Sequence, residues 1–115
     1  MKHQNHEIFI SAIHNKQKIQ VVFYSKKDET YVTRKCAPLD FGPRAKEKTP
    51  IDRYHLWDFL SPSGPHTASL EADQIRSISL VEETFDPGEI VRKIREKNPT
   101  WTPQWHIRRD WGQYS

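Results

Sequence analysis

Residues 17–41, QKIQVVFYSKKDETYVTRKCAPLDF, contain two runs of alternating apolar and polar side chains around a polar centre. This alternation is typical of strands with one buried face, so we expect strands at 18–25 and 31–41. The polar run from Ser25 to Thr30 predicts a hairpin turn between them. Pro38 has no N–H to donate to a neighbouring strand, which predicts an edge, a bulge or a strand end at that position. We therefore expect a bent hairpin.

Three further strands are predicted after this hairpin. Residues 42–52 combine glycine, prolines and charges without a period, which indicates a loop. Tyr54 to Leu60 carries apolar side chains on both faces, as a central strand does. The turn at 61–65 then leads to short strands at 66–71 and 75–82. Five short strands predict a mainly β protein with flanking helices (α+β), built on a small bent sheet or a partly open barrel.

Two helices flank the predicted sheet. Apolar residues share one helical face over 8–13, and Asn5 is a suitable N-cap before them. The second helix has a strong start signal, because Asp86 is a suitable N-cap and Pro87 suits the first helical position. Asn98 and Pro99 should end this helix. The predicted organisation is a domain at 1–85, a helix at 86–98 and a tail at 99–115.

The composition limits the class of protein. A chain of 115 residues can bury one modest core but is short for two ordinary domains. Only 35% of the residues are hydrophobic, and no apolar run approaches the roughly 18 residues that suggest a membrane span. Cys36 is the only cysteine, so we expect no intrachain disulfide and a reducing, cytoplasmic location. The six histidines lack zinc-ligand spacing, and no metal or cofactor is expected.

The basic excess of the chain lies near its C-terminus. Acidic and basic residues balance over 1–87, so the formal net charge of +3 comes from 88–115, which also holds three of the four tryptophans. Aromatic rings interleaved with arginines suit a nucleic-acid surface, because indoles stack on bases and guanidinium groups neutralise phosphates. The same residues could instead cover the open edge of the sheet or pack against a second subunit, and we favour packing or oligomerisation. The candidate contact residues are Trp101, Trp105, Arg108, Arg109 and Trp111.

Three short fragments resemble a known family. Arg34 and Pro38 form an Arg-x-x-x-Pro motif on the second predicted strand, Tyr54-His55-Leu56 begins the third, and Asp73-Gln74-Ile75 leads into the last. In order and position they resemble the WYL domain, an Sm-like β-barrel common in bacterial transcription regulators, over about residues 8–85. The resemblance implies an Sm-like barrel that serves as a sensor and binds nucleic acid or a nucleotide ligand.

Departures from the family pattern limit what can be carried over. Of the Trp-Tyr-Leu that names the family, only Leu56 is kept, and Gln74 replaces an arginine. The strand before Asp73, residues 68–71, has lost the positive charge that the family has there. A helix-turn-helix would not fit ahead of residue 8, so we expect a divergent stand-alone member. Arg34 is the one ligand contact that the resemblance transfers.

Each candidate ligand contact has a structural alternative. Arg34 could hold a phosphate through its planar fork of donors, or pair with a neighbouring carboxylate on the sheet. His55 could stack on a base, or be a half-buried structural residue. The remaining candidates are cations in or next to the predicted loop: Arg44, Lys46, Lys48 and Arg53.

No catalytic group is expected, because the sequence offers no Ser/His/Asp arrangement and no paired carboxylates. We therefore expect a non-enzymatic module that binds single-stranded nucleic acid or a nucleotide in a bacterial regulatory system. The alternative left open is a protein–protein interaction subunit, either a homo-oligomer or part of a larger regulatory complex, with the tryptophan-rich tail at the interface. No membrane association is expected.

Overall fold

A computed structural model describes all 115 residues and contains five strands and two α-helices. The strands are antiparallel neighbours in one sheet of order β4-β3-β2-β1-β5, which does not close into a barrel. The α+β class and the five strands are therefore confirmed. The elements are α1 (His6–Asn15), β1 (Gln17–Ser25), β2 (Thr30–Gly42), β3 (Arg53–Asp58), β4 (His66–Leu70), β5 (Ile75–Thr84) and α2 (Pro87–Lys97), with short 3-10 helices at Ala72–Gln74 and Gly112–Tyr114.

The predicted irregularity at Pro38 is a bulge. Pro38 lies opposite Leu56 of β3 and Asp40 lies opposite His55, so Leu39 is an extra residue on β2. The pairing of β2 with β1 ends before this point, at Cys36. Because Pro38 has no N–H to donate, interrupting the ladder at this position costs the sheet the fewest backbone hydrogen bonds. The bulge also shifts the register, and it is followed by the acidic residue Asp40 in the interior.

The third strand is shorter than the sequence predicts. It ends at Asp58, whose carboxylate accepts a hydrogen bond from the backbone N–H of Leu60 at 2.9 Å. An aspartate that bonds the backbone two residues ahead forms a turn and competes with strand geometry. The expectation that Leu60 belongs to the strand is therefore wrong, and its side chain is 56% exposed.

Helix α1 packs against β1, β2 and β5 with its predicted apolar face. Phe9 and Ile13 are fully buried, and the Phe9 ring meets the Tyr54 ring edge-to-face at 4.9 Å. Asn5 occupies the N-cap position but makes no capping bond with its side chain, contrary to expectation. Its side-chain oxygen instead accepts the N–H of Ile78 on β5 at 3.4 Å. The N-terminal segment therefore covers part of the free edge of β5.

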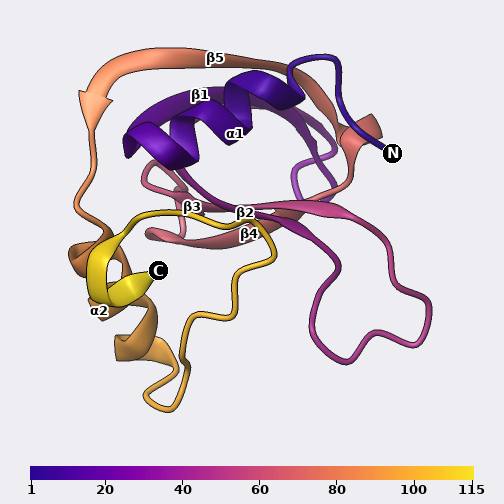
Figure 1. The fold of residues 1–115 in the computed structure, drawn as a ribbon. Coiled ribbons are helices and arrows are strands. Elements are labelled where there is room, and N and C mark those ends of the chain that lie inside the picture. Colours follow the sequence, from indigo (N-terminus) through magenta and orange to yellow (C-terminus); the bar gives the residue numbers. More distant parts are fainter.

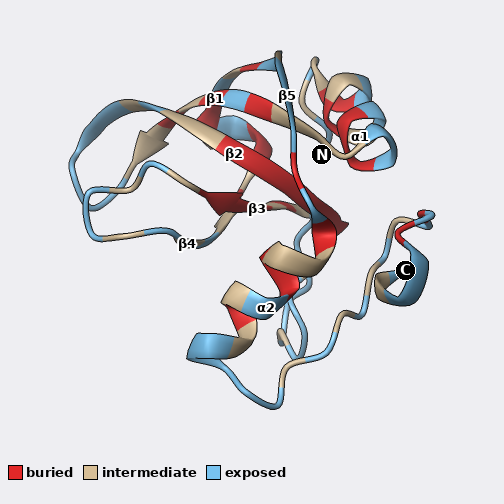
Figure 2. Ribbon diagram, turned by 90° about the vertical axis from the view of Figure 1, so that its left-hand side faces the viewer, coloured by how far each residue is buried: buried red, intermediate tan, exposed pale blue.

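Helix α2 begins as predicted. The Asp86 carboxylate accepts the N–H of Gly88 at 2.9 Å, and Pro87 is the first helical residue. Ile90 and Ile94 belong to the same hydrophobic cluster as the sheet and α1, as does Trp111 in the tail. The three predicted segments thus share one core, with α1 near one end of the molecule and α2 near the other (Figures 1 and 2). Neither helix has the length and apolar character needed to cross a membrane.

Candidate ligand-binding cleft

Two tail residues, Arg109 and Trp111, hold the tail against the sheet and α1. The indole N–H of Trp111 donates to the carbonyl of Ile13 at the end of α1, at 2.9 Å. The Arg109 guanidinium lies over the Trp105 ring at 4.1 Å and the Trp111 ring at 4.4 Å, and so contacts two indoles that are nearly perpendicular to each other. Arg109 and Trp111 are 7% and 3% exposed. We call residues 107–111 the tail anchor.

Asp40 is the group on the sheet that receives the tail anchor. Its carboxylate pairs with Arg109 Nη2 at 3.1 Å and accepts the backbone N–H groups of His106 and Ile107 at 2.8 and 2.9 Å. Burial lowers the pKa of Arg109 to about 10, while the neighbouring Asp40 opposes this change. The guanidinium is still charged at neutral pH, so the two buried charges compensate each other.

Residues 101–106, which we call the first half of the tail, cross closely over the start of the loop at 42–52. His106 Nε2 donates to the carbonyl of Pro43 at 3.1 Å. Gly42 has a φ of +153°, and a Cβ at this position would lie 2.5 Å from Cδ2 of His106. Only glycine therefore allows the His106 ring to lie against this backbone without displacement.

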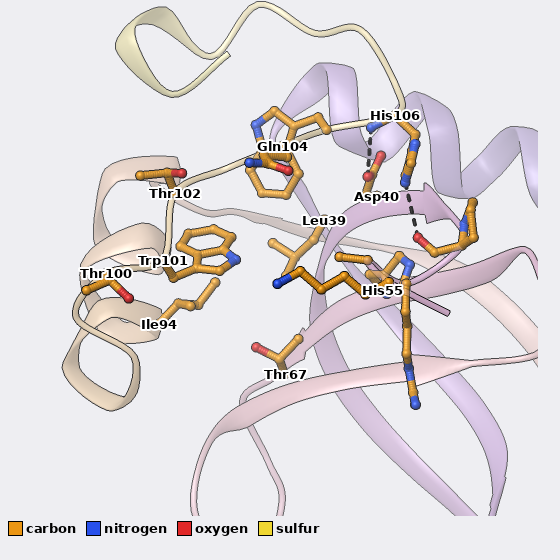
Figure 3. A pocket seen from close by; sticks show the side chains of 15 residues that line it. Leu39, Asp40, His55, Thr67, Ile94, Thr100, Trp101, Thr102, Gln104 and His106 are labelled. Atoms are coloured by element: carbon orange, nitrogen blue, oxygen red, sulfur yellow. Dashed lines mark hydrogen bonds between the residues drawn. The ribbon is translucent and has the colours of Figure 1, made fainter. Parts of the chain in front are cut away.

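A cleft of about 590 Å³ lies between the tail, the C-terminal part of α2, the sheet and the loop (Figure 3). Trp101, Thr100 and Ile94 stand on one side, and His106 with Asp40 stands on the other (Figure 3). The volume falls in the range of about 300–1,000 Å³ that small-molecule sites occupy. The lining residues are Leu39, Asp40, Pro43, Arg44, Ala45, Lys46, His55, Thr67, Ile94, Thr100, Trp101, Thr102, Gln104, Trp105 and His106.

The charge of the cleft is positive. Lys46 forms no ion pair, and Arg44 lies only at the outer limit of one, with its Nε 3.9 Å from Oε1 of Glu47. Glu47 also forms a close ion pair with Arg53 through that same oxygen, so much of its charge is already compensated. The only carboxylate in the lining is Asp40, which Arg109 neutralises. Two cations therefore face the cleft with little opposing negative charge.

His55 fixes the floor of the cleft to the loop. Its Nε2 donates to the carbonyl of Gly42 at 2.8 Å, and its Nδ1 accepts the hydroxyl of Ser69 at 2.7 Å. Burial lowers the pKa of His55, although the bond to Gly42 and the charge of Asp40 act against the change. The neutral ring is thus held by bonds at both nitrogens, which corresponds to the structural alternative.

Arg34, the residue that the family resemblance transfers, lies outside the cleft. Its Nε is 3.3 Å from Oδ2 of Asp58, and the two side chains are 14% and 4% exposed. The contact is an ion pair by distance, although Arg34 Nε has no hydrogen-bond partner. This corresponds to the carboxylate-pairing alternative for Arg34.

The other predicted contacts divide into two groups. Arg44, Lys46, His55, Trp101 and Trp105 come together around the cleft, whereas Lys48, Arg53 and Arg108 do not line it. Arg108 is exposed, while Arg109 and Trp111 are interior. No sequence pattern indicated Asp40, Gln104 or His106 as lining residues, because their placement depends on contacts between distant parts of the chain.

Comparison with family models, with curated proteins and with solved structures finds no match to this chain.

Proposed function

We propose that this protein is a non-enzymatic, WYL-like module with an Sm-like sheet that binds single-stranded nucleic acid or a nucleotide in a bacterial regulatory system. One observation carries the proposal. The cleft combines two tryptophan rings with two cations that have little opposing charge. Planar bases stack on indole rings, and phosphates are attracted to lysine and arginine. The succession of α1 and five antiparallel strands also agrees with the family resemblance.

A binding role fits the chemistry of the cleft better than a catalytic one. The nearest approach to a nucleophile and base is the bond between Ser69 and His55. Ser69 does not line the cleft, and the second nitrogen of His55 is occupied by the Gly42 carbonyl. A serine hydrolase requires a hydroxyl that can reach the substrate and donors for the oxyanion. The pair is therefore proposed to be structural.

The test is a fluorescence-anisotropy titration with labelled single-stranded DNA and RNA at two salt concentrations. If the two cations contact phosphates, the logarithm of the association constant should fall with the logarithm of salt concentration with a slope of about −1.4. Lys46→Gln should weaken binding and reduce this slope by about half. Lys27→Gln is the matched control, because Lys27 is an exposed cation outside the cleft that forms no ion pair. Absence of binding of both polymers and of free nucleotides at low salt would overturn the proposal.

A further inference from the structure

The two sides of the cleft differ in chemical character. Trp101 and Ile94 form an apolar side, and Leu39 lies between them and His55 (Figure 3). The opposite side begins at Pro43, whose carbonyl is held by His106, and continues into the loop that carries Arg44 and Lys46. A ligand that fills this space needs a flat apolar part at one end and an anionic part at the other.

We propose, on the basis of the function proposed above, that the cleft holds one nucleotide through a terminal 5′-phosphate monoester. The base stacks on Trp101, and the phosphate lies between Arg44 and Lys46. The nucleotide is either free or the first residue of a single strand, since both present the same chemical group.

Charge complementarity favours a monoester over an internal phosphodiester. A phosphate monoester carries about −1.5 to −2 charges at pH 7, whereas a diester carries one. Arg44 and Lys46 together supply two positive charges, and the Glu47 carboxylate near Arg44 is also paired with Arg53. The neutral His55 adds no charge to this end of the cleft. Two cations thus match one terminal phosphate.

The size of the cleft also favours one nucleotide over an extended strand. At about 590 Å³ it has the dimensions of a small-molecule site. Domains that bind single strands without sequence preference cover about 4–16 nucleotides and follow the backbone with a positively charged groove. Within this cleft the only cations are Arg44 and Lys46, since Lys48, Arg53 and Arg108 do not line it, and two cations suit one phosphate better than a run of phosphates.

Isothermal titration calorimetry with the four common ribonucleoside 5′-monophosphates and the four matching nucleosides tests the proposal. We expect at least one monophosphate to bind, and its nucleoside to bind at least tenfold more weakly. Lys46→Gln should reduce the affinity for the monophosphate and leave the nucleoside unchanged, because the lysine contacts only the phosphate. Trp101→Ala should weaken both, and Trp101→Phe should restore part of the binding, since it keeps an aromatic ring. Lys27→Gln again serves as the control.

A second titration compares a six-nucleotide single strand that carries a 5′-phosphate with the same strand that carries a 5′-hydroxyl. Preference for the phosphorylated strand supports recognition of a strand end, and binding of the free monophosphate alone supports a soluble nucleotide. Equal binding of the two strands without binding of any monophosphate would overturn the inference and leave the proposed function standing. Absence of binding in every titration at low salt would overturn both.

Discussion

The two halves of the tail both contain tryptophan but lie in opposite environments. Residues 101–106 contribute Trp101, Trp105 and His106 to the wall of the cleft. Residues 107–111, the tail anchor, place Arg109 and Trp111 inside the molecule. Tryptophan occurs in both halves. The two arginines both belong to the second half, and there Arg108 is exposed beside the buried Arg109. Composition alone therefore does not distinguish a residue that holds the chain from one that faces a ligand.

The difference arises from the partner that each half meets on the sheet. The tail anchor gives Asp40, a buried carboxylate, both the backbone N–H of Ile107 and the guanidinium of Arg109. The first half reaches Asp40 through a single backbone N–H, that of His106, and otherwise meets the start of the loop through the His106 ring and the carbonyl of Pro43. A buried charge must be compensated, which fixes the second half firmly, whereas the first half leaves a space beside it.

Removal of the buried arginine should have the largest effect on stability. Arg109→Ala leaves the Asp40 carboxylate buried without its cation, and we expect the free energy of unfolding to fall by about 3–5 kcal/mol. Arg108→Ala, the exposed neighbour without an ion pair, should change it by less than about 0.5 kcal/mol. Urea denaturation followed by tryptophan fluorescence measures both. Similar small losses in the two variants would show that the tail is not anchored through Arg109.

The close approach of the first half should have the next largest effect. In Gly42→Ala, the added methyl group meets His106 at a backbone angle that disfavours side chains, and we expect a loss of about 2–3 kcal/mol. Gly64→Ala is the matched control, because Gly64 also has a positive φ but no atom within 4 Å of the added Cβ. It should cost only about 1 kcal/mol from backbone strain. If thermal denaturation gives equal losses for both, the contact between Gly42 and His106 does not contribute to stability.

Local features of the fold could be predicted from the sequence, and its long-range contacts could not. The Asp86 cap of α2 follows from the chemistry of one or two residues, as does an irregularity at Pro38, for which the sequence left open an edge, a bulge or a strand end. The bond between Arg109 and Asp40 joins residues 69 positions apart, and the sequence around each residue does not indicate its partner. The strands were predicted from alternation and from the turns between them, but Leu60 was wrongly assigned to a strand, because the turn formed by Asp58 overrides its apolar character. Because the tail is placed by such long-range contacts, the sequence indicated the tail residues as candidates without showing which of them line the cleft.

The pH dependence of stability should show the smallest effect and concerns His55 at the floor of the cleft. Burial lowers the pKa of His55 in the folded protein, while the unfolded imidazole keeps a value near 6.5. Between the two values the unfolded chain binds more protons, so stability is complete above about pH 7 and falls as the pH decreases through the folded pKa. His6 has a pKa lowered mainly by burial and adds to the same trend.

We therefore expect the midpoint of urea denaturation to decrease from pH 7.5 to 5.5, and His55→Gln to remove part of this decrease. His14→Gln, at an exposed position on α1, should leave the decrease unchanged. A wild-type midpoint that does not vary over this interval would show that the neutral His55 ring does not help to hold the loop to the sheet.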